Sequence, residues 1–431
     1  MLLSYIMFTF LVLNDFNDIN RANVLHFSLD KGHFVAKSLC NLGHKVYFMT
    51  DAYNYEKDGL IYISMEKITD TFVSKMDYIM IVREPLFLEI IEKLPAIQKM
   101  ISIEKTSRTK PKFIVKSDNP LWSNNKEFVN GMKKFFEINN RRDAKKWVIE
   151  HVDHICCQNQ DYCDLAIYQG IPRSSLLISN MGIENKRIDY NQLTNPYDIN
   201  HSYCVADISM LEREKALLPL YYVEHPEKIS EANTKKHIIV YTGRIKIDGG
   251  KILYNMVNIM KILGDQYELH IFPGSFYYPI PEGNTTRYSG KNANHLKMLR
   301  DGIFASSKNI IIHYPYIHGQ QYAYFHYASC GIDFSQCRPK NVKSFNGHAK
   351  ILEYCETGLP VVCEERINNL FLVENGKNAI VLPYMASDEA YAEAIKKIIN
   401  MPIDREYCQK ITLQNENWDV VIRKLLRQLD N

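Results

Sequence analysis

The most informative chemistry lies in residues 346–362, which read NGHAKILEYCETGLPVV. The apolar spacing predicts a helix that starts near Asn346 and stops at Gly358, a residue type common just after a helix, and then a buried strand from Pro360. A helix that starts at the C-terminal side of a parallel sheet presents free N–H groups and the positive end of the helix dipole there. Both suit the binding of a phosphate group. Lys350 lies near the first turn and adds positive charge.

Glu353 lies further along the same predicted helix. Its carboxylate can accept hydrogen bonds from the two neighbouring hydroxyls of a ribose. A simpler interpretation is an amphipathic helix on which Lys350 and Glu353 are only solvated. Taken alone, the pattern favours that simpler interpretation.

Two acidic residues follow predicted strands in the first half of the chain. Glu84 comes after the strand Tyr78–Val82, and Asp118 comes after the strand Lys112–Val115. Strand ends in an open parallel sheet face the ligand crevice, so either carboxylate is a candidate catalytic base. Capping of a turn by Glu84 and initiation of a loop by Asp118 explain both residues more simply.

The composition indicates an ordinary globular protein. Of the 431 residues, 46% are hydrophobic and 23% are charged, which excludes a disordered or collagenous chain. The 52 basic and 49 acidic residues leave a net charge of +3, too close to neutral to require nucleic acid as a partner. Ten cysteines without a CxxC pair read as reduced core residues and favour a cytoplasmic location.

The apolar stretch 1–13, MLLSYIMFTFLVL, lacks the basic start of a signal peptide and is too short to span a bilayer. We therefore expect a buried first strand there rather than a targeting segment.

Strand-like runs alternate with helical patterns in both halves of the chain, which predicts an α/β protein with parallel sheets. Two such units indicate two Rossmann-like, doubly wound domains that face each other across a cleft. We expect the first domain in residues 1–185, a linker with an insertion in 186–235, and the second domain in 236–410. An amphipathic helix within 414–431 is expected to pack back on the first domain. The strands expected in the second half are Ile238–Thr242, Tyr267–Phe272, Asn309–His313, Gly331–Phe334, Pro360–Cys363 and Ala379–Leu382.

The pattern Lys350-Ile-Leu-Glu353-Tyr354, followed by Gly358-Leu-Pro360-Val-Val, resembles the donor site of the GT-B-fold glycosyltransferases of group 1 (family 4 type). In that family the glutamate binds the ribose of the nucleotide, and the helix start holds the diphosphate. The resemblance therefore implies that Glu353 binds ribose. It also implies a diphosphate seat formed by Asn346, His348, Ala349 and Lys350.

Further motifs match the family in the same order. Tyr241-Thr-Gly243-Arg244-Ile is similar to the family's strand and turn in which an arginine and a following lysine clamp the pyrophosphate. The resemblance implies donor contacts at Gly243 and Arg244, with Lys251 as the candidate for the lysine. With Gly43-His44-Lys45-Val46 and Asn375-Gly376, it extends from about residue 30 to residue 385.

Two departures from the family pattern bear on the chemistry. Many members carry a second glutamate eight residues before the ribose-binding one, and Phe345 stands at that position. His348 replaces the proline of the variant subgroup that has N-x-P-x-K-x-x-E-Y. Retention or inversion of the sugar's configuration thus stays open, and a base such as Asp118 or Glu84 is needed only if the transfer inverts.

The resemblance implies an enzyme, a hexosyltransferase-like glycosyltransferase with a UDP- or GDP-sugar as donor and no other cofactor. The first domain would hold the acceptor, a glycan, a lipid-linked sugar or another hydroxyl compound, and the second the donor. The sequence contains no Asp-x-Asp metal motif, in keeping with a metal-independent site. Two alternatives remain: a transferase that glycosylates modified DNA bases, and a non-catalytic module that binds sugar nucleotides or glycans.

Residues 133–146 hold a cluster of basic residues next to Phe135 and Phe136. They suit an anionic membrane, in which case the protein is membrane-peripheral, or a nucleic acid. A solvated helix face explains them more simply. The nearby group His151, His154 and Cys156, with Cys157 and Cys163, matches no common zinc spacing.

Overall fold

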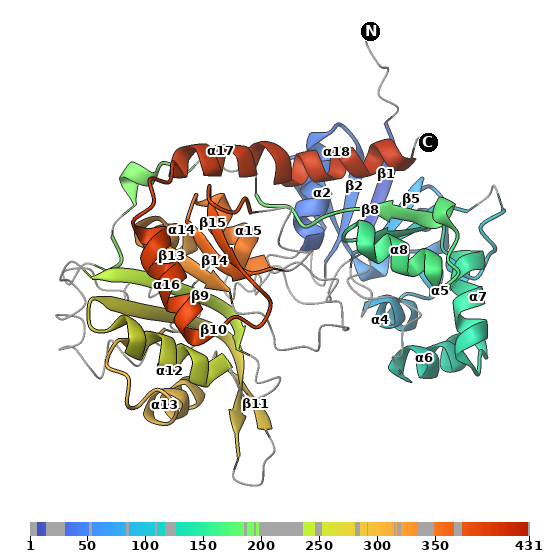
Figure 1. The fold of residues 1–431 in the computed structure, drawn as a ribbon. Helices are drawn as coiled ribbons and strands as arrows, with labels where there is room; N and C mark the ends of the chain where they lie inside the picture. Colours follow the sequence, from blue (N-terminus) through green and yellow to red (C-terminus); the bar gives the residue numbers. More distant parts are fainter. Residues whose placement is uncertain are drawn as a thin grey trace.

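A computed structural model describes the protein over residues 7–13, 31–50, 54–82, 86–107, 110–116, 126–184, 188–193, 195–197, 236–245, 252–280, 285–290, 292–313, 316, 320–333, 349–365 and 373–429. These residues form two α/β units, each built around one sheet (Figure 1).

The first unit contains an eight-stranded sheet in the order β3-β4-β2-β1-β5-β6-β7-β8. All neighbours run parallel except β3 and β4, which are antiparallel. Without β3, the sheet has the doubly wound order in which the chain changes direction between β1 and β5. The strands are β1 (Thr9–Leu13), β2 (Lys45–Thr50), β3 (Tyr55–Lys57), β4 (Leu60–Ser64), β5 (Tyr78–Ile81), β6 (Lys112–Lys116), β7 (His154–Cys157) and β8 (Leu176–Ile178).

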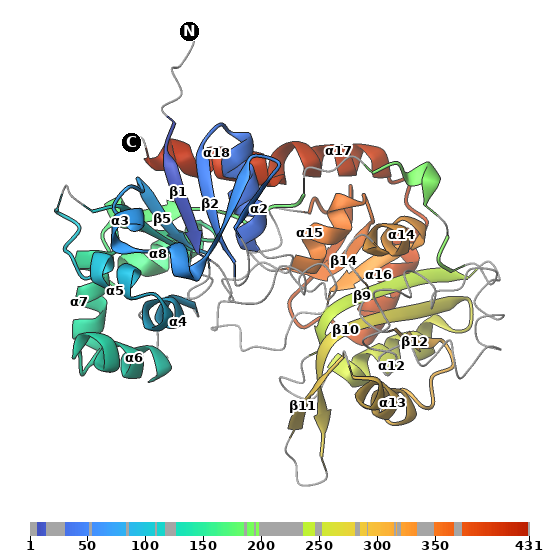
Figure 2. The ribbon, with the colours of Figure 1, turned by 180° about the vertical axis from the view of Figure 1, so that it is seen from behind.

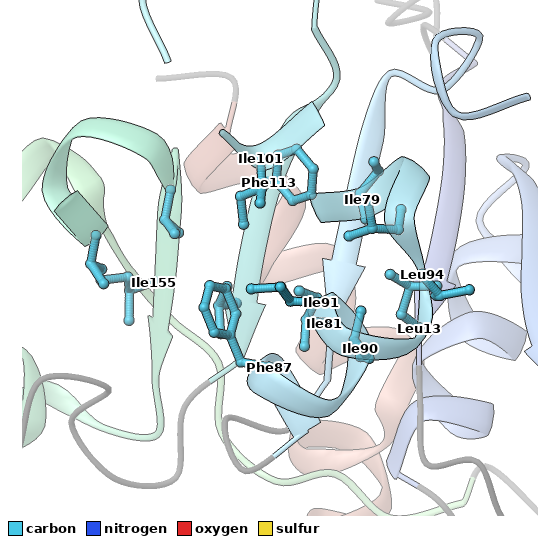
Figure 3. Close-up of a cluster of buried hydrophobic side chains, with 14 of the residues drawn as sticks. Leu13, Ile79, Ile81, Phe87, Ile90, Ile91, Leu94, Ile101, Phe113 and Ile155 are labelled. Atoms are coloured by element: carbon cyan, nitrogen blue, oxygen red, sulfur yellow. The ribbon is translucent and has the colours of Figure 1, made fainter. Parts of the chain in front are cut away.

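Helices cover both faces of this sheet. Figure 3 shows side chains of α4 (Leu86–Lys93) and α5 (Pro95–Ile101) packed against Ile81 of β5 and Phe113 of β6, which are fully buried. The opposite face packs on α2 (Lys31–Asn41) and on the last helix of the chain. The other helices of this unit are α3 (Asp70–Val73), α6 (Lys126–Phe136), α7 (Arg141–His151) and α8 (Gln160–Tyr168).

The second unit contains a seven-stranded sheet in the order β11-β10-β9-β13-β14-β15, with β12 also paired to β10. The parallel strands alone read β12-β10-β9-β13-β14-β15, which is the dinucleotide-fold order with its switch point between β9 and β13. The strands are β9 (His237–Ile245), β10 (Tyr267–Pro279), β11 (Thr285–Ser289), β12 (Ile310–Ile312), β13 (Cys330–Asp333), β14 (Val361–Glu364) and β15 (Ala379–Leu382).

The helices of the second unit are α12 (Ile252–Leu263), α13 (Ala293–Asp301), α14 (Gln320–Tyr327), α15 (Ala349–Glu356) and α16 (Asp388–Ile399). The chain then continues into α17 (Arg405–Glu416) and α18 (Trp418–Leu429). Both views show α17 along the second unit and α18 along the first (Figures 1 and 2).

A short parallel bridge between Ile183 and Asn417 marks where the chain crosses between the units. The N–H of Ile183 donates to the Glu416 carbonyl, and the N–H of Trp418 donates to the Ile183 carbonyl, both at 2.9 Å. Two segments far apart in sequence are thus joined at one point.

The strands expected from the sequence are confirmed, and β1 lies buried between β2 and β5. The short strands β3 and β8 were not predicted from the sequence. β10 was expected to end at Phe272, but it continues into an antiparallel hairpin with β11. Most of the expected linker, 186–235, lies outside the described residues. Within the described part of the chain, no helix has the length and apolar character needed to cross a membrane.

Candidate donor site

The candidate site lies at the switch point of the second sheet. β9 ends with Gly243, Arg244 and Ile245, and its neighbour β13 ends with Asp333. The φ of Gly243 is +93°, which favours glycine, and a side chain built there would place its Cβ 3.7 Å from Cε of Lys350. The last residues of β9 therefore lie against the first turn of α15.

Lys350 is held by two groups from the sheet. Its Nζ lies 3.2 Å from Oδ1 of Asp333 and 4.0 Å from the ring centroid of Tyr241. Burial by itself lowers the pKa of Lys350, but Tyr241 and Asp333 outweigh it, and the pKa lies above the ordinary value. The lysine is therefore a fixed positive charge at neutral pH, with 13% of its side chain exposed.

Glu353 lies one turn further along α15. The Tyr316 hydroxyl donates to its Oε2 at 3.1 Å. Burial raises the pKa of Glu353 to about 7, although the Tyr316 hydrogen bond and the positive charge of Lys350 both act to lower it. The carboxylate consequently changes its charge close to neutral pH.

Tyr354, the next residue, fixes α15 to the sheet. Its hydroxyl accepts a hydrogen bond from the N–H of Thr242 at 3.1 Å and donates to the carbonyl of Val240 at 3.3 Å. The ring is fully buried and lies over Gly331 of β13, where a Cβ would come within 2.5 Å of it. The absence of a side chain at Gly331 is what lets the helix approach so closely.

The predicted end of the helix is confirmed. Gly358 follows α15 with a φ of +67°, and a Cβ there would lie 2.2 Å from the carbonyl oxygen of Arg405. The backbone N–H of Leu359 donates to the Tyr354 carbonyl at 2.9 Å. This glycine is required both by its left-handed conformation and by the close backbone.

The structure brings together several of the residues that the resemblance selected. Gly243, Lys350 and Glu353 lie around the junction of β9 and α15, and Ala349 opens the helix with an exposed position. Arg244 lies at the same strand end with an exposed side chain, and its carbonyl accepts a hydrogen bond from the Tyr241 hydroxyl at 2.9 Å.

The remaining candidates lie outside the described residues. Among the candidate donor contacts these are Lys251, Asn346 and His348, and among the candidate bases they are Glu84 and Asp118. The strands before the last two, β5 and β6, are parallel neighbours in the first sheet.

Three residues of the site were missed by the sequence analysis: Asp333, Tyr241 and Tyr316. Asp333 carried a usable signal, because an acidic residue at the end of a buried strand next to the switch point is unusual. Tyr241 belonged to the matched motif but had no assigned role. Tyr316 follows β12 in an aromatic segment and gave no signal of its contact with Glu353.

Several residues of the basic segment and of the His and Cys group make contacts within the protein. Lys134 pairs with Glu92 at 2.6 Å, and Lys145 donates to the carbonyl of Gln169 at 2.8 Å, so part of the basic segment 133–146 is engaged within the protein. His151 stacks on Trp147 with ring centroids 4.5 Å apart. Among the described residues, no group of three or more His, Cys, Asp or Glu side chains is arranged to hold a metal ion.

No protein-family model matches the sequence, and no curated protein matches it in sequence. The structure, in contrast, matches solved structures over almost its whole length. HepE of Anabaena in complex with UDP-glucose superposes with a TM-score of 0.59 at 11% identity, covering 98% of this chain and 99% of that one.

Sucrose-phosphate synthase of Thermosynechococcus elongatus gives a TM-score of 0.55 at 13% identity, covering 98% and 99%. A UDP-forming α,α-trehalose-phosphate synthase of Burkholderia vietnamiensis gives 0.55 at 8% identity, covering 99% and 97%. The predicted fold is thereby confirmed: the chain has the GT-B arrangement of two Rossmann-like units found in these proteins.

Proposed function

We propose that this protein is a glycosyltransferase that moves a sugar from a nucleotide diphosphate sugar to a hydroxyl acceptor. The observation that carries the proposal is the position of Lys350 and Glu353 on α15 at the switch point of the second sheet, with Lys350 against Gly243 near the end of β9. Open α/β sheets bind their ligands at this place. HepE, a protein of the same fold, is known in complex with UDP-glucose.

The proposed chemistry depends on stabilising the negative charge of the leaving nucleotide. Transfer breaks the bond between the anomeric carbon and a diphosphate oxygen, so negative charge grows on the leaving nucleotide. In this proposal Lys350 and Arg244 stabilise that negative charge, together with the N–H groups at the start of α15. Lys350 is held in place before the reaction by Asp333, so little reorganisation is needed. Glu353 then binds the ribose hydroxyls and fixes the register of the nucleotide.

We propose a UDP-sugar as the donor. HepE is known with UDP-glucose, and the trehalose-phosphate synthase of the same fold is UDP-forming, whereas nothing in the structure speaks for GDP. The site chemistry assigned here uses protein cations and needs no metal ion.

The first unit, from the N-terminus to about residue 185, is the proposed acceptor side, and residues 236–410 are the proposed donor side. Glu84 and Asp118 remain the candidates for the base that activates the acceptor, which is a glycan, a lipid-linked sugar or another hydroxyl compound.

The eight cysteines among the described residues are free thiols, and all but Cys40 are buried, which supports a reducing compartment such as the cytoplasm.

The test is a thermal-shift and calorimetric titration of the whole chain with UDP-, GDP-, ADP-, CMP- and dTDP-glucose, with and without a chelator. We expect stabilisation by UDP-glucose that the chelator leaves unchanged. Glu353→Ala should abolish it, while Glu393→Ala, an exposed glutamate on α16, should not. Hydrolysis of the bound donor would then support an enzyme.

Binding without any hydrolysis or transfer would favour the non-catalytic module instead. A flat response to every nucleotide, or full binding by Glu353→Ala, would overturn the proposal.

A further inference from the structure

We propose that Tyr316 is a positioning residue for donor recognition: its hydroxyl aims the Glu353 carboxylate and holds it in the form that accepts hydrogen bonds from ribose. The inference rests on the proposed function. It deepens that function by naming a residue outside the matched motifs that controls how the site responds to pH.

The inference starts from the hydrogen bond between Tyr316 and Glu353. Tyr316 donates to Oε2 of Glu353 at 3.1 Å, and the side chain of Thr242 hydrogen-bonds to the same Tyr316 hydroxyl. Thr242 belongs to β9, Tyr316 follows β12, and Glu353 belongs to α15. The bond therefore ties the helix to a segment on the opposite side of the switch point.

Tyr316 is itself held rigidly. Tyr316 is 6% exposed. The centroid of its ring lies 5.5 Å from that of Phe272 and 5.9 Å from that of Phe325. Phe272 is in turn stacked on the buried His313 at 4.3 Å. A hydroxyl carried by such a ring has little freedom, so it defines the direction of the carboxylate that it binds.

The backbone of Glu353 is fixed separately, because its neighbour Tyr354 is bonded to β9 through Thr242 and Val240. Tyr354 thus sets where the helix lies, while Tyr316 sets where the carboxylate points. Removal of the Tyr316 hydroxyl leaves the helix in place but frees the side chain of Glu353.

Among the residues that the structure describes, few charged groups surround Glu353. Lys350 on the same helix is the positive charge that acts on it, and Tyr316 is its hydrogen-bond donor. Lys350 in turn contacts Asp333 of β13 and the ring of Tyr241 of β9. Arg244 is exposed at the end of β9. Burial favours the protonated carboxyl, whereas Lys350 and Tyr316 favour the carboxylate.

A ribose needs the carboxylate, so donor affinity should fall as the pH drops through the pKa of Glu353. Loss of the Tyr316 hydroxyl removes a stabilising hydrogen bond from the charged form and raises that pKa. A hydrogen bond to a charged group corresponds to a shift of about one pH unit.

The experiment is a calorimetric titration of UDP-glucose into the whole chain between pH 6 and pH 8.5. In Tyr316→Phe the midpoint of the affinity profile should move up by about one unit, which weakens binding about fivefold at pH 7 but less than about twofold at pH 8.5. Glu353→Gln should bind weakly with a flat profile.

The matched control is Tyr322→Phe. Tyr322 donates to Oε1 of Glu356 at 3.0 Å, so it makes the same kind of bond to the same helix, away from the site. A purely structural role for Tyr316 predicts a loss of affinity that is equal at every pH. Superimposable profiles for wild type and Tyr316→Phe, or an equal shift in Tyr322→Phe, would overturn the inference.

A second measurement needs no donor. The carboxyl carbon of Glu353, assigned by its loss in Glu353→Gln, can be titrated by NMR in protein labelled at glutamate carboxyls. Tyr316→Phe should raise its midpoint and Tyr322→Phe should not. A wild-type midpoint at the ordinary value for glutamate would overturn the inference even if Tyr316→Phe failed to fold.

The two proposals fail in different ways. Binding of UDP-glucose with unshifted profiles removes the role of Tyr316 and leaves the proposed function. A shifted carboxyl titration without any nucleotide binding keeps the Tyr316–Glu353 pair and removes the proposed function.

Discussion

At the scale of single residues, the site is a pair of opposite charges on one helix, each held by a partner from elsewhere in the fold. Asp333 at the end of β13 holds Lys350, and Tyr316 after β12 holds Glu353. The pair is spaced i, i+3, so both side chains leave the same face of α15. A charge that is fixed before the ligand arrives stabilises that ligand more than a mobile one.

Asp333→Asn tests this principle for Lys350. The side chain of Asp333 is 1% exposed, so its loss leaves a largely buried ammonium without its ion-pair partner, and we expect a loss of about 3–5 kcal/mol in unfolding free energy. Affinity for UDP-glucose should fall as well, because Lys350 then keeps its contact with the Tyr241 ring but loses its ion pair, and is less firmly held. Urea denaturation and calorimetric titration measure the two effects.

The control for this change is Asp70→Asn, since Asp70 pairs with Lys99 where both side chains are exposed, and such pairs contribute less than about 1 kcal/mol. Equal stability losses in the two variants would contradict the assigned role of Asp333.

At the scale of elements, the close approach of α15 to the sheet depends on the missing side chain at Gly331 of β13. A Cβ on Gly331 would lie 2.5 Å from the ring of Tyr354, so Gly331→Ala must push the helix outward or strain the ring. We expect a loss of about 1–3 kcal/mol in stability together with weaker UDP-glucose binding.

Gly264→Ala serves as its control. Gly264 has a φ of +79°, and no atom lies within 4 Å of the position that a Cβ would take there, so the change costs backbone strain but leaves the site untouched. Stability should fall modestly and donor affinity should stay the same. A Gly331→Ala variant that loses stability but keeps full affinity would show that Glu353 does not depend on the helix position.

The elements were largely predictable, because buried parallel strands read as short apolar runs such as Ile238–Val240. β3 is an exposed strand of three residues without an apolar run, so it gives no strand signal. β8 is an apolar run as short as β12, and the sequence pattern does not separate it from the turn before it. The extension of β10 escaped because Pro273 and Gly274 look like a strand end, yet the strand passes them with a shift in register. The partners of Lys350 and Glu353 come from segments far apart in sequence, and local pattern does not reveal such contacts.

At the scale of the whole molecule, α17 and α18 join the two units (Figures 1 and 2). α17 packs on α15, and α18 packs on α2 and β8. Trp418, at the start of α18, anchors the junction between α17 and α18 and is 4% exposed. Its ring stacks with that of Phe34, and Nζ of the buried Lys116 lies 4.9 Å from its centroid. Lys116 in turn donates to Oγ of Ser179 at 3.1 Å, just before the crossing at Ile183.

Trp418→Ala therefore removes the anchor of the first unit without touching the candidate donor site. Truncation of a buried tryptophan costs about 3–5 kcal/mol, so the first unit should unfold at a lower temperature than the second and separate into its own calorimetric transition. Affinity for UDP-glucose should be retained, since Lys350 and Glu353 lie on the second sheet. Tyr168→Ala, at an 88% exposed aromatic of the first unit, should change neither transition. If Trp418→Ala abolished nucleotide binding as fully as Glu353→Ala, then the donor site would depend on how the two units are joined, and its assignment to the second unit alone would be wrong.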